Sequence, residues 1–318
     1  MKIRFWGTRG SIAVSLTTQD IRQKLLATLQ AANGRAFADQ AEMEAFIANL
    51  GFDTSGTFGG HTSCVQLITD QPEHIILDLG SGVRALGQHI FALHGPATPQ
   101  TYHVFLSHLH WDHIMGLPFF MPAYTPGNRI IVHSGHANAE AALRRQQDAP
   151  SFPVDFGHMG ANFEFVVHTP GVAQTVAGMT VDLMKQRHSG DSYGWRFDHQ
   201  GARVVYTTDS EHHVDDVAER QACVAFFKNA DAVIFDAMYS LAEAVSVKAD
   251  WGHSSNIVGV EMCLEARAKR LFLYHHEPAQ SDSQIAQILQ ESRRYEEIMR
   301  EGQPLEVLAA WDGLEVTV

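Results

Sequence analysis

The sequence predicts an α/β protein built in four layers, with two mixed β-sheets packed face to face and helices covering their outer faces. In each half of the 318-residue chain, strand patterns first follow one another directly and then alternate with helical patterns. No repeat, low-complexity tract or linker divides the chain. We therefore expect residues 1–318 to form one domain.

Strands are expected where short apolar or alternating stretches lie between turn residues, and helices where apolar residues recur every three or four positions. The expected strands are 2–6, 63–69, 74–79, 102–107, 129–133, 163–168, 180–187, 194–199, 202–208, 232–236, 271–274, 305–309 and 314–318. The expected helices of this framework are 83–93, 137–147, 212–228, 255–267 and 281–300.

Residues 17–56 do not fit this order of strands and helices. Helical periodicity covers 17–31 and 38–50, and Asn33 and Gly34 break the chain between them. We interpret the segment as a helical hairpin inserted into the domain. An amphipathic helix pair must bury its apolar face, so the insertion is expected to act as a lid or as the contact of a homodimer.

The composition describes an ordinary globular protein and argues against two functional classes. The formal net charge is −13, whereas a nucleic-acid-binding protein normally carries a basic face. The chain has no apolar run long enough to span a bilayer, and its N-terminus lacks the features of a signal peptide. Cys64, Cys223 and Cys263 are widely spaced and odd in number, which argues against a disulfide framework. We expect a cytoplasmic protein that binds neither membranes nor nucleic acid.

The histidines are unusually numerous, and several of them cluster. The stretch SHLHWDH at 107–113 places His108, His110, Asp112 and His113 directly after an apolar strand. On a regular strand these side chains would point to opposite faces, but a sharply turning loop at the strand end lets them converge. Neutral imidazoles with a carboxylate suit Zn²⁺ and similar metals. The alternative, a solvated polar loop, does not require this spacing, so the pattern predicts a metal site.

Three stretches carry a resemblance to a known family. They are FWGTRGSI at 5–12, FGGHTSCV at 58–65 and LSHLHWDHIMGLPFF at 106–120. Together they resemble the metallo-β-lactamase superfamily, in particular its PhnP-like and cyclic-nucleotide-phosphodiesterase-like hydrolases, a branch related to tRNase Z. The resemblance extends over nearly the whole chain outside the insertion. The chain departs from the branch at His61, where the branch usually carries Asn, and at the insertion, which replaces a short loop.

The resemblance implies an αββα sandwich and two metal sites that share a bridging carboxylate. His and carboxylate ligands favour Zn²⁺, with Mn²⁺ or Fe as alternatives, so we expect two divalent metal ions as cofactors. The implied ligands are His108, His110 and His188 for one ion, Asp112, His113 and His275 for the other, and Asp209 as the bridge.

The third histidine of the first site should follow a later strand. His188 fits this requirement, because it ends the expected strand 180–187 and precedes a turn that contains Gly190. His158 and His168 are its competitors.

Two further ligands have alternatives next to them. His275 and His276 are adjacent, and in an extended segment they face opposite ways, so one of them reaches the metal and the other supports it. The family pattern favours His275. Asp209 follows the expected strand 202–208, although it could instead cap the helix expected at 212–228.

The stretch WGHSS at 251–255 resembles an element of the tRNase Z side of the superfamily, in which the histidine donates a proton to the leaving oxygen. His253 would take that role, oriented by Asp236, while Asp112 serves catalysis as well as metal binding. Asp78 resembles the acidic residue that supports the metal-binding loop. The alternatives are a packing histidine beside a Ser254 helix cap and a turn-forming Asp78.

These expectations combine into a hydrolase that uses a hydroxide bridging two metals, and whose substrate is a small anionic molecule, a phosphodiester. A proton donor matters most for an alkoxide leaving group, which favours phosphodiester hydrolysis over lactam opening. The alternatives are a lactone or thioester hydrolase and a non-catalytic metal-binding module. Trp111, Phe119, Phe120 and Tyr193 are candidates for apolar walls around the site.

Overall fold

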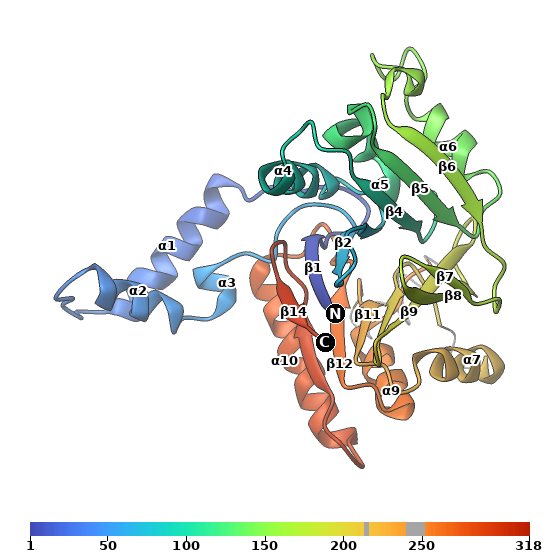
Figure 1. The fold of residues 1–318 in the computed structure, drawn as a ribbon. Helices are drawn as coiled ribbons and strands as arrows, with labels where there is room; N and C mark the ends of the chain where they lie inside the picture. Colours follow the sequence, from blue (N-terminus) through green and yellow to red (C-terminus); the bar gives the residue numbers. More distant parts are fainter. Residues whose placement is uncertain (213–215, 240–251) are drawn as a thin grey trace.

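The computed structural model describes residues 1–212, 216–239 and 252–318. Two seven-stranded mixed sheets pack face to face, and helices lie on their outer sides (Figure 1). The strand orders are β14-β1-β2-β3-β4-β5-β6 and β13-β12-β11-β10-β9-β8-β7. The four-layered α/β sandwich predicted from the sequence is confirmed.

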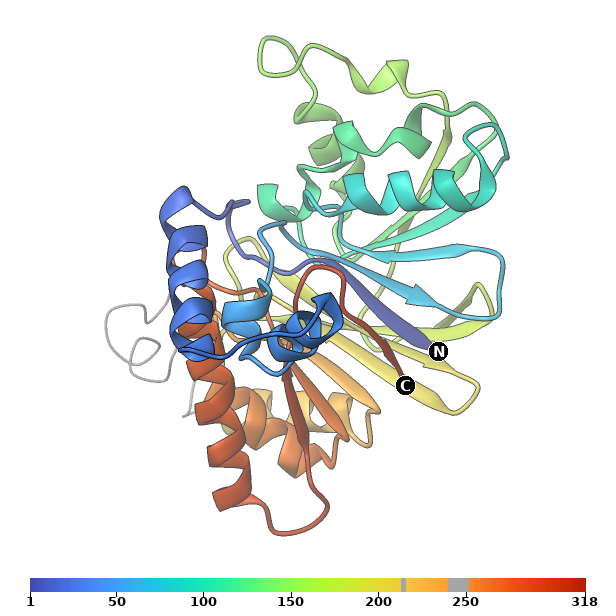
Figure 2. The same cartoon turned by 90° about the vertical axis from the view of Figure 1, so that its left-hand side faces the viewer.

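The first sheet is antiparallel at one edge and parallel from β3 to β6. Its last strand in the chain, β14, pairs with the first, β1, so the two termini lie side by side (Figure 2). Its strands are β1 (Lys2–Gly7), β2 (Cys64–Ile68), β3 (His74–Leu77), β4 (Thr101–Leu106), β5 (Arg129–Ser134), β6 (Asn162–Val167) and β14 (Glu315–Thr317).

The second sheet is parallel from β10 to β13 and antiparallel from β7 to β10. The carboxyl ends of β8, β10, β11 and β12 therefore share one edge of the sheet. Its strands are β7 (Gln174–Val176), β8 (Met179–Gln186), β9 (Ser192–His199), β10 (Ala202–Thr207), β11 (Ala232–Asp236), β12 (Arg270–Tyr274) and β13 (Glu306–Ala309).

Several helices begin at residues whose side chains cap them. Ser281 forms a capping box with Gln284 at the start of the longest helix, and Ser255 accepts from Val258 N–H at the start of another. The helices are α1 (Thr18–Ala32), α2 (Gln40–Ala48), α3 (Phe52–Ser55), α4 (Val83–His94), α5 (Trp111–Ile114), α6 (Ala139–Arg145), α7 (Val217–Phe227), α9 (Asn256–Ala266) and α10 (Asp282–Met299), with 3₁₀ turns η1 (Leu117–Phe119), η2 (Met121–Tyr124) and η3 (Phe156–His158).

The main core lies between the two sheets. Phe5 of the first sheet packs against Phe272 of the second with ring centroids 5.2 Å apart, and Phe105 packs against Trp195 at 5.1 Å. Two further clusters bury the outer faces of the sheets under α4 and under α7 and α9. The three cysteines are buried and unpaired, as expected. The packed sheets form a rigid base for the loops at their strand ends.

The insertion is helical, as predicted, although it contains a third short helix, α3, beyond the two expected, and it lies beside α10 outside the two sheets (Figures 1 and 2). Lys24 of α1 forms an ion pair with the buried Asp282 of α10 at 2.7 Å, and Phe52 of α3 packs on Trp311. No residue of α1 is buried, and its apolar side chains are about half exposed or more. These exposed residues are Ile21, Leu25, Leu26 and Leu29.

Two sequence predictions were inaccurate in detail. The short edge strand β7 was not predicted, because three residues are too few to show an alternating pattern. The helix expected to start at His212 begins at Val217 and is capped by Asp216; residues 213–215 lie outside the described residues. Within the described ranges, no helix is long and apolar enough to cross a membrane.

Candidate metal centre

The predicted ligands lie at the ends of strands from both sheets. His108 follows β4 of the first sheet, and His188, Asp209 and His275 follow β8, β10 and β12 of the second. The motif loop turns into the short helix α5, so that Asp112 and His113 point back toward the strand ends. All seven predicted ligands are therefore brought together at one edge of the sandwich.

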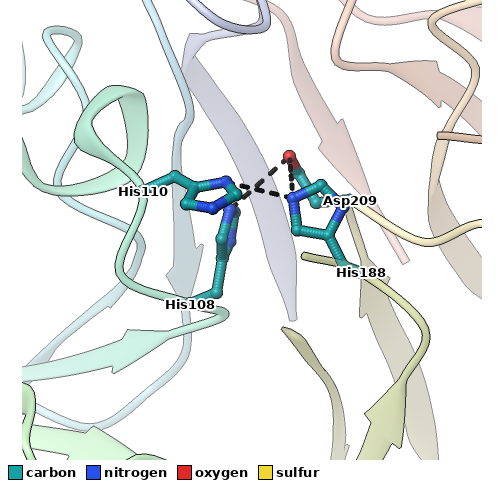
Figure 3. Close-up of side chains that lie close together, drawn as sticks. All are labelled: His108, His110, His188 and Asp209. Carbon is teal, nitrogen blue, oxygen red and sulfur yellow. Dashed lines mark hydrogen bonds and ion pairs between the residues drawn. The ribbon is translucent and has the colours of Figure 1, made fainter. Parts of the chain in front are cut away.

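The first group consists of His108, His110, His188 and Asp209, whose candidate ligand atoms all lie within 4.8 Å of one another. Figure 3 shows His108 and His110 approaching from one side and His188 with Asp209 from the other. His110 Nδ1 is 3.0 Å from His188 Nε2. Asp209 Oδ2 is 3.6 Å from His108 Nε2 and 3.7 Å from His188 Nε2.

The second group consists of Asp112, His113, His275 and again Asp209. His113 Nε2 and His275 Nε2 are 3.2 Å apart. Each of these nitrogens is also 3.2 Å from Asp112 Oδ2, and they lie 3.1 and 3.3 Å from Asp209 Oδ1. One Asp209 oxygen thus faces each group, which is the arrangement that a bridging carboxylate requires.

Asp78 orients two of these imidazoles. Its carboxylate accepts from Ser107 N–H, Ser107 Oγ–H, Tyr206 O–H and His113 Nδ1, all at 2.7–2.8 Å. Because Ser107 Oγ–H donates to Asp78, this oxygen accepts from His108 Nδ1 at 3.1 Å. Both histidines therefore hold their proton on Nδ1 and turn the Nε2 lone pair toward the cluster. Asp78 supports the metal-binding loop, and its positive φ of 59° also makes it a turn residue.

The ligand atoms fit a metal ion in number, type and spacing. Ligand atoms of a tetrahedral zinc site with bonds of about 2.0–2.1 Å lie roughly 3.3 Å apart. Neighbouring ligand atoms in the two groups lie 3.0–3.7 Å apart, and all ligand atoms of a group lie within 4.8 Å of one another. His108 Nε2 is buried and has no hydrogen-bond partner among the described residues, so its lone pair is available for a cation.

The site also concentrates unusual backbone geometry and negative charge. Asp78, Asp209 and His275 all have positive φ values of 49–60°, a backbone conformation that is uncommon for residues other than glycine. Burial alone would raise the pKa of Asp209, but the surrounding imidazoles outweigh it and lower the pKa. Asp209 is therefore an ionised carboxylate in a buried place, which a bound cation would neutralise.

His253 and Asp236 lie beside both groups. His253 Nδ1 donates to Asp236 Oδ2 at 2.9 Å, and the His253 ring centroid is 5.2 Å from those of His188 and His275. Burial lowers the pKa of His253, but the carboxylates of Asp236 and Asp209 outweigh it and raise the pKa to about 9. The helix cap near this histidine is Ser255, not Ser254, and Trp251 of the motif lies outside the described residues.

The competing histidines lie elsewhere. His276 Nε2 donates to Ala310 O at 2.9 Å, and burial lowers its pKa to about 3. His168 is buried against Trp195 and bonded to His133, and His158 is exposed in η3. The structure thus brings His188 and His275, rather than these alternatives, into the cluster.

Asp209 does not cap α7, because that helix begins at Val217. Sequence reasoning missed three supporting residues, since nothing in their spacing marks them. Ser11 N–H donates to Asp112 Oδ2 at 2.8 Å, Tyr206 donates to Asp78, and Gly252 O accepts from His188 Nδ1 at 2.7 Å.

The four aromatic residues expected around the site divide into two pairs. Trp111 and Phe119 are 62% and 54% exposed, so they remain available to a ligand. Phe120 and Tyr193 are buried and serve the core, because the first packs under Tyr102 and the second lies between the sheets.

Comparison with known proteins agrees with this fold. A family model described as a beta-lactamase superfamily domain matches residues 74–276, which is more than half of the chain. The protein therefore belongs to the metallo-β-lactamase superfamily. The matched residues include all seven predicted ligands.

Individual relatives are distant. A ribonuclease Z from Thermoplasma acidophilum is 30% identical over 95 residues, which are 30% of this chain and 28% of that protein, so the similarity spans less than a third of the ribonuclease. The metallo-beta-lactamase fold protein YhfI from Bacillus subtilis has a TM-score of 0.63 at 17% identity, covering 99% of this chain and 98% of YhfI. A diphosphatase from the PhnP family has a TM-score of 0.62 at 17% identity, covering 100% and 97%. These structures share the fold.

Proposed function

We propose that the protein is a metal-dependent phosphodiester hydrolase whose seven ligands hold two divalent cations, Zn²⁺ in the first place and Mn²⁺ or Fe as alternatives. Its preferred substrate is a small anionic phosphodiester. The observation that carries the proposal is the His253–Asp236 pair, which lies against both metal-binding groups and is connected to Asp209 by a 3.9 Å approach.

The ligand set supplies what the reaction needs from a metal site. Two divalent cations bound there would lower the pKa of a water molecule and neutralise charge on the phosphate oxygens. Asp209 presents one carboxylate oxygen to each group and would bridge the two cations. His110 is the exposed member of the first group, so the cluster is open on its side and a substrate phosphate reaches it from there.

His253 supplies the leaving-group proton in this proposal. Its Nδ1–H is held by Asp236, which is itself fixed by Ser210 N–H at 3.2 Å and Met238 N–H at 3.1 Å. In the imidazolium form the second proton is on Nε2, the atom free of Asp236. A donor at this position protonates an alkoxide as its bond to phosphorus breaks.

The donor favours a phosphodiester over a lactone or thioester. An alkoxide is a poor leaving group and gains most from protonation, whereas a thiolate leaves readily without it. The local similarity to a ribonuclease Z supports phosphodiester chemistry, and the shared fold of a PhnP-family diphosphatase supports hydrolysis at phosphorus. The formal net charge of −13 does not oppose an anionic substrate, because bound cations dominate the local field.

The test combines elemental analysis of the purified protein with a screen of linear and cyclic phosphodiesters, a lactone and a thioester. We expect close to two equivalents of a divalent metal and turnover of a phosphodiester. Turnover of the lactone or thioester alone would overturn the substrate assignment. Bound metal with no turnover of any of these substrates would show a metal-binding module rather than an enzyme.

A further inference from the structure

The hydrogen bonds behind His188 form a closed ring that passes through Glu211. His188 Nδ1–H donates to Gly252 O at 2.7 Å, and Gly252 N–H donates to Glu211 Oε2 at 3.0 Å. Glu211 N–H in turn donates to Arg187 O at 2.9 Å, and Arg187 immediately precedes His188 in the chain. The ring thus starts and ends at the same metal-ligand candidate.

Gly252 has no room for a side chain beside His188. Its φ is +84°, and a Cβ atom there would lie 2.4 Å from His188 Nδ1. The backbone of Gly252 therefore lies directly against the imidazole, and a small displacement of this residue would move the carbonyl that accepts the His188 proton. Glu211 holds the amide side of the same residue.

Asp209 and Ser210, which precede Glu211 in the chain, contact other residues of the proposed active site. Asp209 faces both metal-binding groups, and Ser210 N–H donates to Asp236. Ser210 O accepts from Ser254 Oγ–H. Residues 209–211 therefore attach to the segment on both sides of His253, with Glu211 as the attachment nearest to His188.

We propose that Glu211 is a positioning residue for the cation site formed by His108, His110 and His188. Its carboxylate accepts from Gly252 N–H and so fixes this residue, and the Gly252 carbonyl keeps the His188 proton on Nδ1 and leaves the Nε2 lone pair for the cation. The inference rests on the metal binding in the proposed function and is independent of which substrate is hydrolysed.

Truncation and conservative replacement of Glu211 should have different effects on metal affinity. Glu211→Ala removes the acceptor for Gly252 N–H. Loss of a group bonded directly to a ligand histidine weakens a metal site by about 10–100-fold, so loss of this support, one bond further out, should weaken it by about tenfold. Glu211→Gln keeps an acceptor oxygen at the same position, so its metal affinity should stay close to that of the unmodified protein. The site of Asp112, His113 and His275 should bind equally in all these proteins.

Glu296 of α10 offers a matched control. Its Oε1 accepts Leu305 N–H at 2.9 Å, and the residue is 5% exposed, but it belongs neither to the ring nor to the metal-binding groups. Glu296→Ala therefore removes the same kind of bond, a carboxylate accepting a backbone amide, without touching His188. Its thermal unfolding also calibrates how much stability such a truncation costs by itself.

The experiment titrates Zn²⁺ into the metal-free full-length proteins in competition with a chelator of known affinity. We expect two sites in the unmodified protein, one of them weakened about tenfold in Glu211→Ala and neither changed in Glu211→Gln or Glu296→Ala. In a His188→Ala background, Glu211→Ala should weaken binding no further.

Several outcomes would overturn the inference: unchanged affinities in Glu211→Ala, equal weakening by Glu211→Gln, or further weakening in the His188→Ala background. If the unmodified protein binds no Zn²⁺, the proposed function loses its metal site and the inference fails with it. If it binds two ions and Glu211→Ala does so equally well, the inference about Glu211 fails and the proposed function stands.

Discussion

Replacing His253 by alanine tests the proposed chemistry most directly, because it removes the proton donor and leaves all seven ligand candidates in place. His253 donates to Asp236 at 2.9 Å and contacts the ligand groups through its ring. The side chain is 11% exposed, and its ring contacts are with His188, Tyr239 and His275 at the cluster. Folding and metal binding are therefore expected to survive.

The size of the effect should depend on the leaving group. General acid catalysis contributes typically about 10²–10⁴-fold to a rate, which corresponds to about 3–5 kcal/mol. A dinucleotide with an alkoxide leaving group should lose that factor in kcat. A bis(p-nitrophenyl) phosphate, whose phenolate leaves without protonation, should lose about tenfold or less on the same principle.

The assay compares kcat and KM of both diesters for the unmodified protein, His253→Ala and Asp236→Asn, after each has been shown to bind the same amount of metal. Asp236→Asn keeps an oxygen but loses the anionic partner of His253 Nδ1, so it should show the same dependence on leaving group at smaller size. Equal losses on both diesters, or an unchanged rate on the dinucleotide, would refute the donor role.

Three further predictions concern a hydrogen-bonding carboxylate, a buried histidine and an exposed helix face. Asp78→Asn replaces an acceptor of four hydrogen bonds, so it should weaken Zn²⁺ binding about 10–100-fold, measured by competition with a chelator. An unchanged affinity would contradict the role of Asp78 in orienting His113. Burial lowers the pKa of His133 to about 3, below its ordinary value of about 6.5, so the unfolded chain binds one more proton between these values and stability falls as the pH falls. His133→Gln should remove up to about 1.4 kcal/mol per pH unit of this loss in urea unfolding of the metal-free protein, and parallel pH dependences would refute the assignment. If the exposed face of α1 is the expected homodimer contact, the double variant Leu25→Glu, Leu29→Glu should be a monomer in light scattering where the unmodified protein is a dimer. Leu93→Glu, at an exposed residue of α4, is the control and should stay a dimer. A monomeric unmodified protein would refute the dimer.

The strands and helices were largely predictable because local periodicity encodes them. Alternation marks β8 and β9, and apolar spacing with a capping box marks α10. Local patterns were less reliable for the ends of helices and for the burial of single side chains. The expected start at His212 missed the Asp216 cap, and Phe120 looked like a site residue although it packs in the core, because its burial depends on Tyr102 and α4 rather than on its neighbours in sequence.

The metal-binding motif was predictable for the same reason. His108, His110, Asp112 and His113 lie within one loop, so their types and spacing already specify convergence after a strand. The more distant ligands were reached through the resemblance to the superfamily and not through any local rule. Their alternatives in the sequence, such as His168 and His276, have the same side chain and similar strand-end positions.

The sequence by itself determined the layered α/β class and the motif loop, because both depend on residues close together in the chain. Only the tertiary structure decided that His275 rather than His276 faces Asp209, which ring nitrogens carry protons, and that Glu211 closes a ring behind His188. These features depend on how separate strand ends meet across two packed sheets. Contacts between residues tens to hundreds of positions apart leave no periodic trace in the sequence.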